Sequence, residues 1–329
     1  MSLRLSRVRK GALLSAALVV ALLPAWMPAS AASSGVLSLI TEPDDQMKTV
    51  DTFILAAKST LDMTMYELAD TTAQQDLAAD ARRGVKVRVI LDQNREKTNN
   101  QAAFDFLNSH GVQAVWAPAG FKATHQKTIT DDGSVSLVLS GNLTSRYYPT
   151  SRDFGVVDHD ASDVAAIEKT FAADFAGTSI TPPTGTDLVW SPTNSQSSLL
   201  ALIAGAKTAL SIENEEMGDT AITNALVAAA KRGVKVSVTM TNSASWTQAF
   251  DTLAAAGVQI ATYAQTASLY IHAKVIIADG AKAFVGSENF SDASLNGNRE
   301  LGLITPDAAI VASLAKTLAA DHAGGTPWK

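Results

Sequence analysis

The chain has 329 residues, of which 47% are hydrophobic and 18% charged, and it contains no cysteine. This apolar content excludes wholesale disorder, and the lack of cysteine excludes a disulfide scaffold, a zinc ribbon, an iron–sulfur cluster and a cysteine nucleophile. A formal net charge of −6 argues against binding duplex DNA over a broad basic surface. The length corresponds to about two domains, or to two copies of one unit.

Residues 1–31 predict a secretory signal peptide. Basic side chains within the first ten residues precede an apolar stretch from Gly11 to Leu23, and Ala29-Ser30-Ala31 offers a cleavage site. Pro24 ends the apolar stretch, which is shorter than the roughly 20 residues of a membrane-spanning helix. A retained membrane anchor is the competing interpretation. We expect a secreted or periplasmic protein that is cut after Ala31.

Helical and extended patterns alternate along the remaining chain. Helical apolar spacing covers residues 46–57, 72–83 and 99–109, then 196–206, 220–232 and 247–256. Runs typical of strands cover residues 61–65, 85–91 and 112–116, then 210–212, 234–240 and 258–262. A closing amphipathic helix is expected at 307–323. This alternation predicts an α/β fold in which helices flank mixed, mostly parallel β-sheets.

The chain also repeats itself. Lys58-Ser59-Thr60-Leu61 is echoed by Lys207-Thr208-Ala209-Leu210, and the segment 82–87 is echoed by 231–236. Repeats at a fixed interval indicate duplication of one structural unit. We therefore predict two similar halves, at residues 32–180 and 181–329. Residues 178–187, with two prolines and one glycine, are the expected linker.

The pattern His-x-Lys-x4-Asp occurs once in each half. Its residues are His125, Lys127 and Asp132 in the first half and His272, Lys274 and Asp279 in the second. A serine, an asparagine and an acid follow each histidine at offsets of 15, 17 and 28: Ser140, Asn142 and Asp153, then Ser287, Asn289 and Glu300. Five matched offsets in two copies argue strongly against chance. The other histidines are not followed by these motif residues, and we interpret His110, His159 and His322 as surface, turn or helix-end residues.

The spacing predicts which side chains share a face. Residues i and i+2 of a strand point to the same side, so His125 should project with Lys127. Asp132-Gly133 is a hairpin-turn dipeptide, and a two-residue turn would place His125 opposite Ser140. The second half repeats this arrangement, with His272 opposite Ser287.

The two acids that follow the histidine in each half are expected to differ in role. The motif aspartates, Asp132 and Asp279, lie seven residues from their histidines, so we expect them to hold the turn or a local ion pair. Asp153 and Glu300 are the better candidates to hold the imidazoles, because a carboxylate on one ring nitrogen fixes the tautomer that the other nitrogen uses.

Two such faces turned toward each other would suit phosphodiester chemistry. Lysine ammonium groups neutralise phosphate oxygens, while asparagine and serine add donors. One histidine can attack phosphorus while the other protonates the leaving oxygen. The sequence shows neither the carboxylate cluster typical of Mg²⁺ sites nor a His-x-x-x-His pair, so we expect metal-independent chemistry without a cofactor.

The doubled motif with its following Ser-x-Asn resembles the phospholipase D superfamily, and the resemblance covers essentially the whole mature chain. It implies an active site at the interface between two α/β halves and a phosphohistidine intermediate, with His125 as nucleophile and His272 as general acid. It further implies phosphate binding by these residues: Lys127, Lys274, Ser140, Asn142, Ser287 and Asn289. Residues 210–215 are similar to the Ile-Glu-Asn run before the second motif of many members. The first motif departs from the family, with Leu139 where glycine is usual.

Three substrates or roles remain open from the sequence. A secreted phospholipase D would act on phospholipids at a membrane or micelle surface, with water or an alcohol as acceptor and no obligatory protein partner. Aromatic residues near the motifs favour it: Trp116, Phe121, Tyr147, Tyr148, Tyr263 and Tyr270. A nonspecific nuclease acting on DNA or RNA would need a local basic cleft, for which the candidates are Arg82, Arg83, Lys86, Arg88, Arg95 and Lys97. An inactive binding module is disfavoured because both motifs are complete. We expect the phospholipase.

Overall fold

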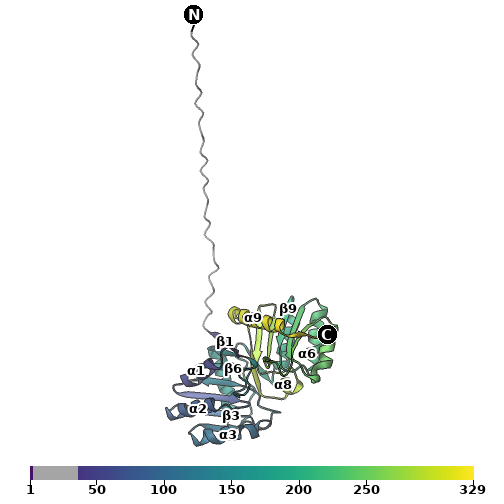
Figure 1. The fold of residues 1–329 in the computed structure, drawn as a ribbon. Coiled ribbons are helices and arrows are strands. Elements are labelled where there is room, and N and C mark those ends of the chain that lie inside the picture. The colour runs from purple at the N-terminus through teal and green to yellow at the C-terminus, as the bar shows by residue number, and fades with distance from the viewer. Residues whose placement is uncertain (3–35) are drawn as a thin grey trace. The chain divides into compact units, whose positions relative to one another are not determined.

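The computed structural model describes residues 1–2 and 36–329 (Figure 1). The predicted signal peptide therefore lies, apart from its first two residues, outside the described residues, and its cleavage stays a prediction. Among the described residues, no helix has both the length and the apolar character needed to cross a membrane.

The N-terminal half alternates helices and strands. In chain order it consists of β1 (Leu37–Glu42), α1 (Lys48–Ala56), β2 (Thr60–Met65), α2 (Thr71–Arg82), β3 (Lys86–Leu91), α3 (Lys97–Ser109), β4 (Gln113–Trp116), β5 (Thr128–Asp131), β6 (Val135–Leu139), β7 (Ser151–Asp158) and α4 (Ala161–Phe175). Residues 176–187, which include the expected linker at 178–187, contain no helix or strand.

The C-terminal half repeats this order with four additional short elements. It consists of β8 (Leu188–Ser191), α5 (Ser195–Gly205), β9 (Ala209–Glu213), α6 (Thr220–Lys231), β10 (Lys235–Thr241), the 3₁₀ helix η1 (Ala244–Trp246), α7 (Thr247–Ala255), β11 (Gln259–Tyr263), β12 (Tyr270–Ile271), β13 (Val275–Ala278), β14 (Lys282–Gly286), α8 (Asp292–Asn296), β15 (Glu300–Thr305), α9 (Ala308–Gly324) and β16 (Thr326–Pro327). The additional elements are η1, β12, α8 and β16. The prediction of two similar α/β halves from an internal duplication is confirmed.

Each half contains one mixed sheet. The strand orders are β1-β7-β6-β5-β2-β3-β4 and β16-β11-β10-β9-β13-β14-β15-β8. Only β2-β3-β4 and β9-β10-β11 are parallel within these orders, and the other neighbours are antiparallel. The sheets are thus less parallel than predicted, because the motif segments continue into hairpins, and a short turn can join only antiparallel strands.

The apolar core has parts inside each half and a part shared between them. One buried cluster draws only on residues before 160, and a second only on residues after 185. A third combines Phe154 and Val156 of β7 with Val275 of β13 and Leu301 of β15. Burial of apolar side chains from both halves stabilises their contact, and this contact fixes how the two motif segments face each other.

The halves also exchange backbone hydrogen bonds next to the motif histidines. β12 runs parallel to the start of β7, and Thr124 forms a parallel bridge with Arg299. The amide of His125 donates to the carbonyl of Arg299 at 2.9 Å, and that of His272 donates to the carbonyl of Arg152 at 3.2 Å. The backbone amide of each motif histidine is therefore bound to the opposite half, at the residue that directly precedes Glu300 or Asp153.

Candidate active site

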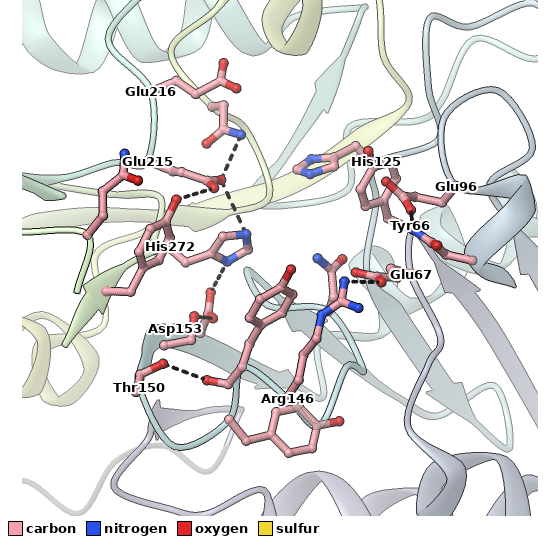
Figure 2. Close-up of a pocket in the computed structure, with 18 of the residues that line it drawn as sticks. Tyr66, Glu67, Glu96, His125, Arg146, Thr150, Asp153, Glu215, Glu216 and His272 are labelled. Carbon is pink, nitrogen blue, oxygen red and sulfur yellow. Dashed lines mark hydrogen bonds and ion pairs between the residues drawn. The ribbon is translucent and has the colours of Figure 1, made fainter. Parts of the chain in front are cut away.

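A pocket of about 620 Å³ lies between the two halves (Figure 2). His125 and Asn142 line it from the N-terminal half, and His272, Asn289 and Glu215 line it from the C-terminal half. The two motif histidines thus share one cavity although 147 positions separate them in the sequence.

Each imidazole is held by an acid of the other half. His125 Nδ1 lies 2.8 Å from Glu300 Oε2, and His272 Nδ1 lies 2.8 Å from Asp153 Oδ1. The structure therefore brings Asp153 and Glu300 against the imidazoles, with the pairing crossed between the halves. Because Nδ1 of each ring faces a carboxylate, Nε2 is the nitrogen left for a substrate.

Other polar side chains fix the two acids in turn. Asp153 accepts hydrogen bonds of 2.6 Å from the hydroxyls of Ser140 and Ser151. Glu300 accepts from Ser294 and, at 2.9 Å, from Asn298. Ser140 is fully buried behind Asp153 and does not line the pocket. Its counterpart Ser287 is also fully buried, and its hydroxyl accepts the Leu301 amide at 3.2 Å.

Electrostatics make the two acids anionic and His125 neutral at neutral pH. Burial opposes ionisation of Asp153, but the charges of His272 and Lys274 outweigh it and lower its pKa to about 2. The pKa of Glu300 is also lowered, since His125 and Lys127 outweigh burial. Burial lowers the pKa of His125 despite the opposing charge of Glu300. His125 consequently has a free lone pair on Nε2.

Both motif lysines are fully buried behind the histidines. Lys127 Nζ donates to the carbonyl of His125 at 2.6 Å, and Lys274 Nζ donates to the carbonyl of His272. Burial and the nearby charge of Lys274 lower the pKa of Lys127 to about 7. Lys127 is therefore an ammonium that loses its proton near neutral pH, and neither lysine is among the residues that line the pocket.

We expect kcat/KM for a phosphodiester to fall as the pH rises through about 7. Since the pKa of Lys127 is lowered in the folded protein, its ammonium is present below that value and lost above it. The measurement is the pH profile of bis(p-nitrophenyl) phosphate hydrolysis, compared with Lys127→Met. The variant should be slower at low pH and lack this decline. A wild-type profile that stays flat to pH 9 would contradict the assignment.

The hairpin turns differ from the predicted ones by one residue. Asp131 pairs with Val135 and Ala278 pairs with Lys282, so each turn has three residues rather than two. The register of β5 and β6 is therefore shifted by one residue from the predicted one: Thr128 pairs with Val138 rather than with Leu137, so His125 is out of register with Ser140. Asp132 and Gly133 both have positive φ, which explains why an Asp-Gly dipeptide stands there.

The motif aspartates lie at these turns and do not line the pocket. Asp132 accepts the amides of Lys58, Ser59 and Thr60 at 2.6–3.2 Å, where β2 begins. Asp279 accepts the corresponding amides of residues 207–209. Each aspartate thus ties a turn to the start of the neighbouring strand.

Asp132→Ala is expected to lower the free energy of unfolding by about 1 kcal/mol, the usual cost of losing a side-chain oxygen that caps backbone amides. kcat/KM should stay near the wild-type value because the carboxylate does not line the pocket. Urea denaturation and bis(p-nitrophenyl) phosphate hydrolysis measure the two effects. A loss of turnover with unchanged stability would instead place Asp132 in catalysis.

Two pocket residues without a predicted role also contact the motif side chains. The ring of Tyr66 meets that of His125 edge-on, with centroids 4.5 Å apart. Glu215 Oε2 lies 3.3 Å from His272 Nε2 and 3.2 Å from Lys274 Nζ. Both follow strands, β2 and β9, at equivalent points of the repeat, so aligning the two halves would have singled them out.

The family profile described as "Cardiolipin synthase, PLD-like domain" matches the chain twice, at residues 50–175 and 199–322. The chain belongs to this family of phospholipase D-like proteins. The family assignment and the fold implied by the resemblance are therefore confirmed. A search of curated protein sequences gave no match.

Solved structures with this phospholipase D-like fold include proteins of different activities. Polyphosphate kinase from Porphyromonas gingivalis matches with a TM-score of 0.68 at 16% identity, over 86% of this chain and 46% of the kinase. Phosphatidylserine synthase from Haemophilus influenzae matches with a TM-score of 0.68 at 11% identity, over 87% of this chain and 85% of the synthase. The chain spans less than half of the kinase. At these identities the likeness concerns the fold alone.

Proposed function

We propose that the protein is an exported, metal-independent phosphodiesterase that removes glycerophospholipid headgroups through a phosphohistidine. The observation that carries the proposal is the pair of imidazoles in one pocket, each with Nδ1 held by a carboxylate of the opposite half. Water or an alcohol would be the acceptor. Because one chain supplies both motifs, the chemistry needs no protein partner.

The first step is attack on phosphorus by Nε2 of His125. His125 suits the role of nucleophile because burial lowers its pKa and keeps the ring neutral. His272 has carboxylate oxygens near both ring nitrogens, an arrangement that suits a proton donor. As the phosphorus–oxygen bond to the headgroup breaks, His272 gives its proton to the leaving alcohol.

The second step reverses these roles for the acceptor. His272, now neutral, takes a proton from water or an alcohol, whose oxygen attacks phosphorus. The bond between phosphorus and His125 Nε2 then breaks. The products are phosphatidic acid with water, or a new phosphatidyl ester with an alcohol, and both histidines regain their initial protonation states.

The rim of the pocket supports a phospholipid over a nucleic acid. Its lining residues include the carboxylates of Glu96 and Glu216, together with the rings of Tyr147 and Tyr270. The carboxylates attract a cationic headgroup and repel a polyanion, and the rings add cation–π attraction for a cationic headgroup. Arg146, the sole Lys or Arg among the lining residues of the described chain, pairs with Glu67 at 2.9 Å.

The cations proposed for a basic cleft lie elsewhere. The residues concerned, none of which lines the pocket, are Arg82, Arg83, Lys86, Arg88, Arg95 and Lys97. Arg88 is paired with Asp62, and Arg83 with Asp80. These contacts disfavour the nuclease, since cations that already have partners are less available to phosphates.

The test is choline release from phosphatidylcholine micelles by purified mature protein in excess chelator. Release that His125→Ala protein lacks would support the proposal, and ethanol would then reveal transfer to an alcohol. Activity lost in chelator and restored only by metal would contradict the metal-independent mechanism. Degradation of DNA or RNA without turnover of any common phospholipid would favour the nuclease. N-terminal sequencing of exported protein tests cleavage after Ala31.

A further inference from the structure

At one pair of equivalent positions in the pocket, the two copies of the internal repeat carry chemically different side chains. Tyr66 follows β2, and Glu215, 149 positions later, follows β9 at the same point of the repeat. Both line the pocket, and each contacts the motif histidine of its own half. One half therefore presents an aromatic ring where the other presents a carboxylate.

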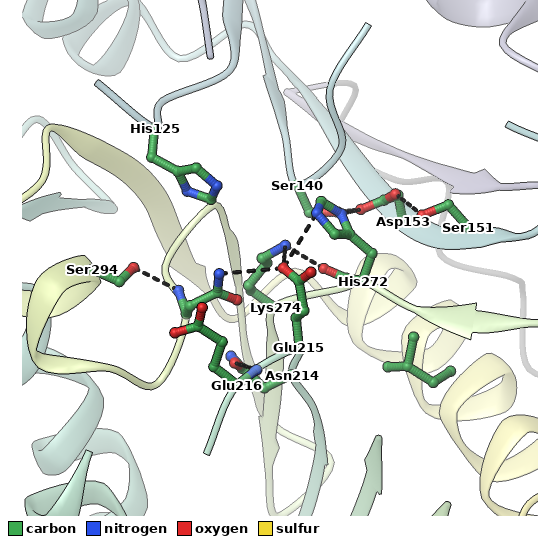
Figure 3. Close-up of polar contacts among 12 residues, drawn as sticks. His125, Ser140, Ser151, Asp153, Asn214, Glu215, Glu216, His272, Lys274 and Ser294 are labelled. Atoms are coloured by element: carbon green, nitrogen blue, oxygen red, sulfur yellow. Dashed lines mark hydrogen bonds and ion pairs between the residues drawn. The ribbon is translucent and has the colours of Figure 1, made fainter. Parts of the chain in front are cut away.

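A single oxygen of Glu215 meets the phosphate-binding groups of the C-terminal half (Figure 3). Oε2 lies 3.3 Å from His272 Nε2, 3.2 Å from Lys274 Nζ and 3.3 Å from Asn289 Nδ2. The other oxygen, Oε1, accepts from the Tyr270 hydroxyl at 3.1 Å. An ammonium, an amide and an imidazole around one oxygen are the surroundings expected for a phosphoryl oxygen.

The equivalent groups of the N-terminal half have no such occupant. Lys127 Nζ lies 5.1 Å from the centre of the Tyr66 ring, and its hydrogen bond goes to the His125 carbonyl. In the described part of the chain, no carboxylate forms an ion pair with Lys127, whereas Lys274 pairs with Glu215. The N-terminal half thus has no carboxylate at the position that Glu215 occupies in the C-terminal half.

The contacts of Glu215 permit displacement. Charge-assisted hydrogen bonds usually span about 2.7–2.9 Å, so contacts of 3.2–3.3 Å are loose. The Glu215 side chain is 23% exposed toward the pocket, unlike Lys274, which is fully buried. A substrate oxygen that enters this position would meet rigid donors and a movable carboxylate.

We propose that Glu215 sets the selectivity of this site for singly charged phosphodiesters, with Oε2 holding the place of a phosphoryl oxygen until the substrate displaces it. The inference rests on the proposed phosphodiester chemistry. The nearby carboxylate repels a second negative charge, so inorganic phosphate and phosphate monoesters are disfavoured more than diesters. Glu215 therefore also weakens retention of any dianionic product.

The first test measures binding of inorganic phosphate by calorimetry near pH 7, where part of the Lys127 ammonium is still charged. Glu215→Gln keeps the shape and removes the charge, and it should bind phosphate about tenfold more tightly or better, as expected when one nearby like charge is removed. Glu216→Gln is the matched control, because Glu216 lines the same pocket and has no ion pair with Lys274 among the described contacts. Its phosphate affinity should change less than twofold.

The second test compares bis(p-nitrophenyl) phosphate with p-nitrophenyl phosphate as substrates. The preference for the diester should fall at least fivefold in Glu215→Gln, in line with weaker repulsion of the second charge. Glu215→Ala, with thermal unfolding as a check on folding, separates charge from shape. Unchanged phosphate affinity in both folded variants would overturn the inference. Tighter binding of phosphate by a protein that turns over no phospholipid would support the role of Glu215 while refuting the lipid substrate.

Discussion

His125→Ala is expected to slow phosphodiester cleavage by about 10⁴-fold or more, because the variant cannot form the covalent intermediate. His272→Ala should also be severely impaired, since the leaving alcohol loses its proton donor. The two variants should differ in what they accumulate. Without His272 to activate the acceptor, a phosphoryl group transferred to His125 has no efficient route of release.

The measurement combines steady-state turnover with detection of covalent label. The protein is exposed briefly to ³²P-labelled substrate and then denatured, and label that acid removes indicates a phosphohistidine. Label should appear on His272→Ala protein and be absent from His125→Ala protein. His110→Ala is the control, because His110 is exposed and bonds to the Phe106 carbonyl. The opposite labelling pattern would reverse the roles of the two histidines, and wild-type turnover by either motif variant would refute the two-histidine mechanism.

The asymmetry of the site explains why equivalent histidines can act differently. His125 is desolvated beside the Tyr66 ring and faces one carboxylate, whereas His272 has the carboxylates of Asp153 and Glu215 near its two nitrogens. Desolvation favours a neutral imidazole, which suits His125 to the role of nucleophile. The duplication supplies two histidines, and the Tyr66/Glu215 difference distinguishes them.

Local patterns predicted much of the fold because the helices and parallel strands have regular periodicity. Elements such as α2, α6, β3 and β10 lie within two residues of their predicted positions. β1 and β7 were not predicted as strands. β7 pairs with β6 as well as with β1, and the pairing with β1 joins segments more than 100 positions apart, which no local pattern encodes.

In the candidate site, too, local patterns predicted the residues but not the contacts between distant segments. Matched offsets identified both motifs and the two acids, but the crossed pairs His125–Glu300 and His272–Asp153 depend on how the halves pack. The three-residue turns could not be distinguished from two-residue turns by an Asp-Gly dipeptide alone. One signal in the sequence was overlooked: Arg152 and Arg299 repeat at the interval of the motifs, as do Asp174 and Asp321.

These repeated residues form two reciprocal ion pairs between the halves. Arg299 Nε lies 2.9 Å from Asp174 Oδ2, and Arg152 Nε lies 2.7 Å from Asp321 Oδ2. All four side chains are at least nine-tenths buried. Each arginine directly precedes an acid of the site, Asp153 or Glu300, and its carbonyl binds a motif histidine of the other half. The pairs therefore connect the packing of the halves to the catalytic geometry.

Asp174→Ala is expected to lower the free energy of unfolding by about 3–5 kcal/mol, because it leaves the guanidinium of Arg299 buried without a counter-ion. Asp321→Ala should cost less, since the buried Glu213 carboxyl lies near Arg152 and can take over as its partner. Guanidinium chloride denaturation measures both. Asp292→Ala is the control, because the Lys122–Asp292 pair also connects the halves but is exposed, and its loss should leave stability almost unchanged.

The double variant Asp174→Leu/Arg299→Met separates the ion pair from the packing around it. Replacing both partners of a buried pair by apolar side chains of similar volume removes the unpaired charge, so most of the stability lost in Asp174→Ala should return. kcat/KM should recover in parallel, because the Arg299 carbonyl that anchors His125 belongs to the backbone and does not need the guanidinium. A double variant with restored stability and no activity would show that the guanidinium itself, and not the packing of the halves, sets the geometry of the histidines.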